Sequence, residues 1–439
     1  MFEYVELKNF KSFKDTRLNL LDRYNNPKKL VLIYGENGIG KSNIASSFFM
    51  LYETLKTMDV RDFMEALLSK NIDDIKYSEE FKSILKTKYK DIEDIIRENK
   101  TVNSKEPMHV EFGFNIKNKS GRYIIETDDN QYIYEKLEYT INKRRGIYFE
   151  ITTSDISINE KIFLDKTSYI NIQESLVKFW GKHSFLSILL HEVNDKSDQY
   201  FKDQISEPFN DVIEFLRSTS CKIKIGSQQE RAILGYPKSI LGDYINGYVS
   251  DFNKEILDKT EKMLTLFLKQ TNRNIKKAYY KTQNIDNEIR YKLMVKNKIC
   301  GELRDIDFSF ESTGTQSIVE QLPFMLVSTI GNVSVLDEFD TGMHDILVRN
   351  LITSLYHCIN GQMILTTHNT SLMESDIPKD SIYVINETND GNKEIECILS
   401  YDNKIGDKNN IRKQYLGGKY SGIPSKSSID FNELLDILK

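Results

Sequence analysis

Residues 35–42, which read GENGIGKS, constrain the fold of this chain more than any other stretch. They fit the pattern G-x-x-x-x-G-K-[ST] at every defined position. An apolar run, KLVLIY, precedes them, and a segment with helical spacing, NIASSFFMLYETLKTM, follows. A phosphate-binding loop requires this order of strand, glycine-rich turn and helix, because backbone N–H groups and the helix start then face phosphate oxygens. The sequence therefore predicts a nucleotide-binding protein.

The residues of this loop have separate expected roles. We expect Lys41 to reach the β- and γ-phosphates of ATP and the hydroxyl of Ser42 to bind Mg²⁺. ATP and Mg²⁺ are therefore the expected cofactors. The predicted nucleotide contacts from this loop are Asn37, Gly38, Gly40, Lys41, Ser42 and Asn43.

Composition limits the class of protein. The 439 residues have a net charge of −5, so there is no overall basic field, and a surface for nucleic acid would have to be local. The 4 cysteines are scattered without a C-x-x-C pair, which indicates reduced thiols. We find no signal peptide and no apolar run of the ~18 residues that span a membrane. We therefore expect a cytoplasmic protein with no membrane partner.

The periodicity of apolar residues divides the chain into a core and an insertion. Period-two runs at about residues 108–163 predict an antiparallel sheet, whereas residues 168–283 have mainly helical spacing. Beyond residue 291, strands alternate with helices, which is typical of a mostly parallel sheet. We predict an α/β fold: a P-loop NTPase core with a mixed sheet, an antiparallel β subdomain and a large helical insertion. The predicted parts are the N-terminal half of the core at 1–165, the insertion at 166–290 and the C-terminal half at 291–439.

A second motif, VSVLDEFD at residues 333–340, is an apolar strand that ends in acids. Ligands of open α/β sheets gather at that end of the strands. We expect Asp337 to hold Mg²⁺ and Glu338 to orient or deprotonate the attacking water. A helix N-cap is the alternative use of such acids, but the phosphate loop favours catalysis. His368 ends the next apolar run, QMILTTH, where it would touch the γ-phosphate; a structural histidine is the alternative.

A third motif, STGTQ at residues 312–316, begins a helix ahead of the acidic strand. A small hydroxyl, a glycine and a helix N-terminus make an anion site of the same physical kind as the phosphate loop. One nucleotide has little use for two such sites in one chain, whereas two facing copies would each close over the other's γ-phosphate. The motif therefore predicts a homodimer, or a higher homo-oligomer, with shared ATP sites.

The order of LKNFKSF, GENGIGKS, STGTQS, VLDEFD and TTH resembles that of the ATP-binding-cassette ATPases of the SMC and RecF kind. The resemblance implies an ABC-type core in which Ser312, Gly314 and Gln316 act across an ATP sandwich. It also implies that Asp340 lies in the loop that contacts the other protomer and that His368 is a switch residue. The long coiled coil of SMC proteins is missing, because no heptad run is long enough.

The segment RKQYLGGKYSGIP, residues 412–424, is similar to the C-terminal segment of RloA-like and AbiL-type ATPases of bacterial phage-defence operons, a group that includes AriA of PARIS systems. From the residues alone, a surface hairpin explains it equally well. The resemblance implies an ATPase that senses DNA or a phage protein and controls a separate effector, a nuclease or toxin. The alternatives are a RecF-like repair ATPase that clamps DNA and a scaffold that barely hydrolyses ATP. The family's Mg²⁺-sensing glutamine has only Gln131 and Gln173 as candidates.

Overall fold

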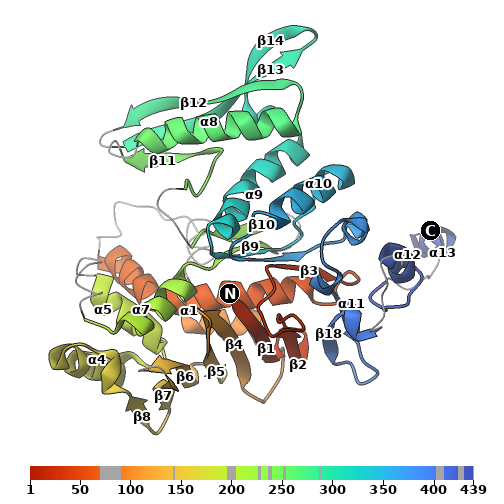
Figure 1. The fold of residues 1–439 in the computed structure, drawn as a ribbon. Helices are drawn as coiled ribbons and strands as arrows, with labels where there is room; N and C mark the ends of the chain where they lie inside the picture. The colour runs from red at the N-terminus through yellow and green to blue at the C-terminus, as the bar shows by residue number, and fades with distance from the viewer. Residues whose placement is uncertain are drawn as a thin grey trace.

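Helix α1 (Lys41–Ser69) lies between two seven-stranded sheets, an antiparallel one and a mixed central one (Figure 1). Helices α9 (Thr313–Thr329) and α10 (Asp345–Tyr356) cover the face of the central sheet that points away from α1. A smaller four-stranded sheet stands beyond α9 and is covered by helix α8 (Lys254–Thr271). The structure is a computed structural model that describes residues 1–69, 90–141, 144–194, 204–225, 229–235, 240–250, 254–285, 288–401, 410–423 and 430–438.

The central sheet has the strand order β10-β9-β15-β16-β3-β17-β18, and neighbouring strands from β9 to β17 are parallel. Both of its faces are buried, which explains why β3, LVLIY, is continuously apolar. Val31 and Ile33 pack toward α1, whereas Leu32 and Tyr34 pack toward the side of α9 and α10. The predicted fold class, an α/β P-loop core with a mixed sheet, is confirmed. The strands are β3 Leu30–Tyr34, β9 Ser220–Ile225, β10 Gln229–Ile233, β15 Val333–Leu336, β16 Gln362–Thr366, β17 Ile382–Glu387 and β18 Lys393–Cys397.

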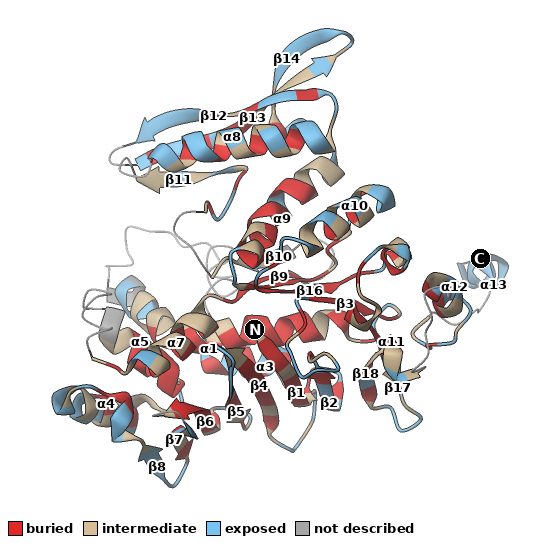
Figure 2. Ribbon diagram, in the orientation of Figure 1, coloured by how far each residue is buried: buried red, intermediate tan, exposed pale blue. Residues whose placement is uncertain are grey.

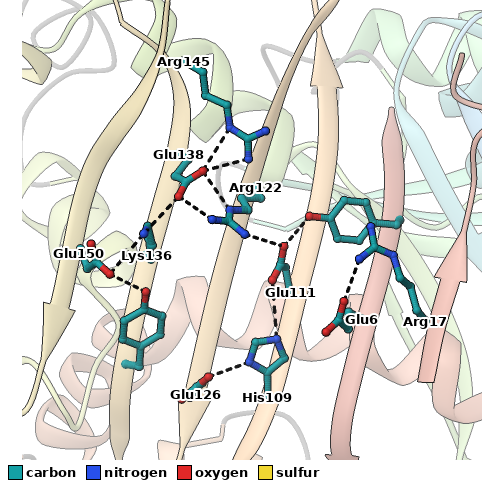
Figure 3. Close-up of polar contacts among 12 residues, drawn as sticks. Glu6, Arg17, His109, Glu111, Arg122, Glu126, Lys136, Glu138, Arg145 and Glu150 are labelled. Atoms are coloured by element: carbon teal, nitrogen blue, oxygen red, sulfur yellow. Dashed lines mark hydrogen bonds and ion pairs between the residues drawn. The ribbon is translucent and has the colours of Figure 1, made fainter. Parts of the chain in front are cut away.

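The antiparallel sheet has the order β2-β1-β4-β5-β6-β7-β8, so the predicted antiparallel subdomain is present and also includes the N-terminal hairpin. Its inner face is apolar: the ring of Phe112 lies 5.7 Å from that of Phe48 on α1. Its outer face carries ion pairs between neighbouring strands, such as Arg122–Glu138 and Lys136–Glu150 (Figure 3). The strands are β1 Phe2–Phe10, β2 Phe13–Asn19, β4 Met108–Ile116, β5 Lys119–Thr127, β6 Tyr132–Ile141, β7 Arg144–Thr152 and β8 Ile156–Ile158.

The insertion predicted at residues 166–290 contains helices and also strands that the prediction omitted. Strand β9 joins the central sheet beside β15, and β13 and β14 belong to the small sheet, so the core resumes at α9 and not at residue 291. Period-two runs as short as SCKIKI give too weak a signal among helices. The insertion's helices are α4 Lys166–Phe179, α5 Phe185–Asn194 and α7 Glu207–Arg217, together with α8. The small sheet comprises β11 Asn246–Ser250, β12 Ile275–Ile285, β13 Glu288–Ile299 and β14 Glu302–Asp307.

The described part of residues 412–424, whose sequence resembles that of defence ATPases, packs against the end of β3, just before the phosphate loop. Tyr415 of α12 (Ile411–Leu416) places its ring 5.8 Å from that of Tyr34, the last residue of β3, and Tyr420 is fully buried. Through residue 423 it is a helix and turn, not a hairpin; residue 424 lies outside the described residues. None of the described helices is both long and apolar enough to cross a membrane. The remaining elements are α3 Ile92–Asn99, η2 Glu160–Ile162, η4 Phe308–Phe310, η5 Thr370–Glu374, η6 Lys379–Ser381, α11 Ile398–Tyr401 and α13 Phe431–Leu438.

One buried amide joins the two large sheets. The Oε1 of Gln362 accepts the N–H of Phe2 at 2.8 Å, and its Nε2 donates to the carbonyls of Phe2 (3.0 Å) and Lys28 (2.9 Å). Gln362→Met keeps the volume but leaves these three backbone groups unpaired, so we expect a loss of about 3 kcal/mol. The melting temperature should fall by several degrees, whereas the matched variant Gln270→Met, at an exposed position of α8, should melt like the wild type. Equal melting temperatures would contradict a linking role for Gln362.

Candidate nucleotide site

The phosphate loop connects β3 to the first residue of α1. Gly38 (φ 79°) and Gly40 (φ 117°) have backbone conformations in which a side chain would be strained. The ammonium of Lys41 donates to the carbonyls of Gly35 and Glu36, each at 2.8 Å, so it closes the loop from within. Burial lowers the pKa of Lys41, and the nearby carboxylate of Asp337 opposes that change. The predicted loop geometry is therefore present, with the lysine at its centre.

Asp337 follows β15 at the carboxyl edge of the central sheet and is 5% exposed. Its Oδ1 accepts the hydroxyl of Thr366 at 2.6 Å. Burial raises the pKa of Asp337, although Thr366 and the nearby side chain of Ser42 oppose that rise. A desolvated carboxylate beside a serine hydroxyl offers the hard oxygen donors that Mg²⁺ prefers. Asp337 and Ser42 therefore fit the predicted metal site.

Glu338 has an unusual backbone and a specific partner. Its φ of 46° is uncommon for a residue with a side chain, and its N–H is held by the hydroxyl of Thr366 at 2.8 Å. Its Oε2 lies 3.0 Å from the ammonium of Lys224 and 3.4 Å from the hydroxyl of Thr341. Burial alone would raise the pKa of Glu338, but the hydrogen bond and charge of Lys224 outweigh burial and lower it. The expected general base is therefore held as a carboxylate.

Lys224 was missed by sequence reasoning, since it lies on β9 within the insertion. Its only sequence signal is alternation in the short run SCKIKI, which does not reveal the strand's neighbour. The pairing of β9 with β15 brings Lys224 to Glu338. On the same strand, Lys222 forms ion pairs with Glu230 (2.8 Å) and Glu320 (3.2 Å) instead.

His368 and Asp340 lie at the same edge of the sheet. The Oδ2 of Asp340 accepts the backbone N–H of His368 at 3.3 Å. Partial burial, followed by the positive charge of Lys41, lowers the pKa of His368, while Asp340 and Glu338 act in the opposite direction. The structure thus brings together Lys41, Asp337, Glu338, Asp340 and His368, which the sequence had predicted from three separate motifs.

The predicted signature residues lie at the head of α9. Ser312 is exposed, and its Oγ accepts the N–H of Thr315 at 3.3 Å, while Gln316 Nε2 donates to the Ser309 carbonyl at 2.9 Å. A Cβ on Gly314 would lie 2.5 Å from the carbonyl oxygen of Gly342, so only glycine allows this close approach. The head of α9 therefore contacts η4 and the loop that follows Glu338.

A cavity of about 250 Å³ lies between the head of α9 and the acidic strand. Gln316 and Thr313 line it from the helix, and Glu338 and Lys224 line it from the sheet. The candidate base, Glu338, and one candidate signature residue, Gln316, of the same chain therefore border one cavity.

The two glutamine candidates are wrongly placed for a magnesium sensor. Gln173 lies on α4, and Gln131 precedes Tyr132, whose N–H bonds to Gly181. The segment after Gly181 packs on α1 at Thr54, roughly 20 Å along the helix from its start at 1.5 Å per residue.

Comparisons with known proteins give one family match over most of the chain and several distant structural likenesses. Residues 30–374 match a family model described as "AAA domain, putative AbiEii toxin, Type IV TA system". No curated protein matches the chain. Three similar solved structures are SMC head domains: one bound to the C-winged helix domain of ScpA (TM-score 0.41, 14% identity, covering 90% of this chain and 96% of that one), one from Thermotoga maritima (0.38, 14%, 90% and 98%), and one from Pyrococcus furiosus with an extended coiled coil bound to the C-terminal domain of ScpA (0.36, 15%, 90% and 95%). These likenesses are too distant to transfer an activity or a partner.

The Lys224–Glu338 pair predicts a change in the pH dependence of ATP hydrolysis. Lys224 lowers the pKa of Glu338, so in Lys224→Gln burial should raise that pKa. A base with a raised pKa loses its proton-accepting form at higher pH, so the acid limb of the kcat–pH profile should move to higher pH. Lys222→Gln removes a lysine of the same strand that does not contact Glu338 and should leave the limb in place. Identical profiles for the two variants would show that Lys224 does not tune Glu338.

Proposed function

This chain belongs to the family of AAA domains, and from that membership we propose that it is an enzyme that binds and hydrolyses ATP. The observation that best supports hydrolysis is the meeting of a buried lysine, a desolvated aspartate and a glutamate at one edge of a parallel sheet. Lys41 belongs to the phosphate loop, and Asp337 and Glu338 follow β15. This arrangement suits one chemistry, the transfer of a phosphoryl group to water.

Each residue then has a role in one step. Lys41 neutralises the β- and γ-phosphates, and the loop N–H groups orient them. Ser42 and Asp337 would hold Mg²⁺, which when bound neutralises further charge on the phosphate oxygens. Glu338 accepts a proton from water while the water oxygen bonds to the γ-phosphorus. The bond between the γ-phosphorus and the β,γ-bridging oxygen breaks, which gives ADP and phosphate. His368 would sense the γ-phosphate through its hydrogen-bonding side chain.

We further propose that ATP joins two copies of the chain. The exposed head of α9, with Ser312 at its N-cap, would close over the γ-phosphate held by the partner copy. Its packing against Gly342, and the hydrogen bond from Ser317 to the Thr341 carbonyl at 3.2 Å, connect that head to the loop after Glu338. Closure of the two copies would therefore shift Glu338, the candidate base, in the chain that supplies the α9 head. Asp340, in the loop after Glu338, would face the partner copy.

For the cellular role, we propose a regulatory ATPase of a bacterial phage-defence system that controls a separate nuclease or toxin. Two observations support it: the family description names the AbiEii toxin and type IV toxin–antitoxin systems, and residues 412–424 resemble defence ATPases. DNA or a phage protein would be the trigger. Phage plating on cells that express the chain with its neighbouring genes tests the role; equal plating with Lys41→Ala in place of wild type would refute it.

A nucleotide-gated scaffold is the second candidate. The ion pair between Lys224 and Glu338 favours it, since it occupies the carboxylate that would activate water. A wild-type chain that binds ATP and closes, but turns over no faster than Glu338→Gln, would be such a scaffold.

Glu338→Gln separates binding from hydrolysis. The amide keeps the shape but cannot accept the proton, so we expect ATP binding close to wild type and turnover lower by about 10²-fold or more. Lys41→Ala is the contrasting variant: loss of the ammonium at the loop should abolish binding itself. Binding is measured by calorimetry and turnover by phosphate release. Wild-type turnover by Glu338→Gln would remove Glu338 from the catalytic role.

Ser312→Arg tests the shared site. We expect it to bind ATP in its own phosphate loop yet not to hydrolyse it, because a large cation would block the partner's γ-phosphate. A mixed dimer with Lys41→Ala has one site with both elements intact and one with neither, so activity that returns on mixing would establish action across the interface. If mixing restores no activity, the oligomeric state of Glu338→Gln tests the shared site instead. Glu338→Gln should be a dimer or larger by light scattering in saturating ATP and Mg²⁺, and a strict monomer would defeat the model.

A further inference from the structure

The face of the small sheet that points away from α8 is basic and aromatic. Leu264 and Leu268 of α8 belong to the same apolar cluster as Leu293 of β13, so the helix covers one face only. The strand residues that alternate with these buried ones point to the opposite face and are exposed or half-buried. Figure 2 shows much of β12 in pale blue, the colour of exposed residues. We call this surface the basic face. Its cations and tyrosines are Tyr248 of β11, Lys277, Tyr279 and Lys281 of β12, and Arg290, Lys292, Lys296 and Lys298 of β13.

The strand register arranges these side chains in alternating rows. Tyr248 lies opposite Arg290, and the next row pairs Lys281 with Lys292. The following rows pair Tyr279 with Met294 and Lys277 with Lys296. Rows two residues apart along antiparallel strands are about 7 Å from one another. Rings and cations therefore alternate along the sheet at a regular interval.

Two of these rows place like charges directly opposite each other, an arrangement that destabilises a sheet. The outer face of the large antiparallel sheet does the reverse: Arg122 lies opposite Glu138, and Lys136 lies opposite Glu150, each in an ion pair (Figure 3). The small sheet departs from that pattern between β12 and β13, where lysine faces lysine, although β14 places Asp305 opposite Lys296. A bound polyanion would offset the repulsion that remains on the β12 side of these rows.

The acids near the basic face neutralise part of it. Glu288 shares the face at its end, Asp307 forms an ion pair with Lys292, and Asp305 lies 3.8 Å from Lys296. Asp305 also accepts the hydroxyl of Tyr279 at 2.9 Å. Among the described residues no acidic side chain forms an ion pair with the following cations: Lys277, Lys281, Arg290 and Lys298.

We propose that the basic face binds single-stranded nucleic acid, with lysines on phosphates and the tyrosine rings against bases. Unpaired cations attract any polyanion, but rings between the cationic rows favour a strand whose bases are unstacked and free to contact them. Tyr248 is 56% exposed, so its ring is open to such a base. This surface lies outside the nucleotide site, and the proposal does not depend on ATP hydrolysis.

The test converts the repulsive rows into attractive ones. In Lys277→Glu/Lys281→Glu each glutamate faces a lysine, so the variant should melt at or above the wild-type temperature. Its affinity for a labelled 20-nucleotide single strand, measured by fluorescence anisotropy at low salt without ATP, should fall at least about tenfold. The slope of log affinity against log salt should shrink by about 0.7 for each phosphate that the variant no longer neutralises. Tyr248→Ala should weaken binding about tenfold with the salt slope unchanged.

Lys262→Glu/Lys269→Glu is the matched control, because it makes the same charge change at exposed positions of α8, on the other side of the unit. It should bind the single strand within about twofold of wild type. The proposal is overturned if the wild-type chain does not bind the oligonucleotide, or if the two double variants lose affinity equally. Tighter binding of the matching duplex would also overturn it. So would competition by polyglutamate as strong as that by unlabelled strand at equal charge, since an acidic protein would then be the partner.

Discussion

The buried carboxylate of Asp337 is the constraint on which the rest of the nucleotide site depends. It lies where β15, β16 and the start of α1 meet; it accepts a hydrogen bond from Thr366, and the side chain of Ser42 lies near it. A carboxylate in so dry a place has a raised pKa and needs a compensating positive charge. The neighbouring ammonium of Lys41 supplies part of it, and a bound divalent cation would supply the rest. Parallel pairing of the strands makes this meeting possible, because it brings all their carboxyl ends to one edge.

The inserted segment is part of the site and not an addition to it. Strand β9 returns from the insertion to pair with β15, and it is this pairing that gives Glu338 its lysine. The small sheet also reaches the core by a short connection. Asn297 of β13 donates to Glu311 at 2.7 Å, next to Ser312 at the head of α9. One inserted part therefore contacts the acidic strand β15, and the other contacts the segment just before the head of α9.

The two antiparallel sheets treat surface charge differently, and the difference has a physical basis. On the large sheet the cations Arg122 and Lys136 each have an acid across the strand, so their charges are satisfied without a partner (Figure 3). On the small sheet Lys281 faces Lys292, and no acid within the described residues forms an ion pair with Lys281. Net charge hides this contrast, because −5 is a sum over the whole chain.

The sequence by itself determined the phosphate loop, the acids after β15 and the α/β fold class, since each depends on a local pattern: fixed glycine spacing, or apolar periodicity over one element. It also predicted that Lys41, Glu338 and His368 would meet, because parallel strands share an edge. Only the tertiary structure decided which residues outside these motifs reach that edge. Lys224 comes from a strand too short to recognise among helices. Strand pairing, unlike periodicity, is a contact between distant segments that no local pattern encodes.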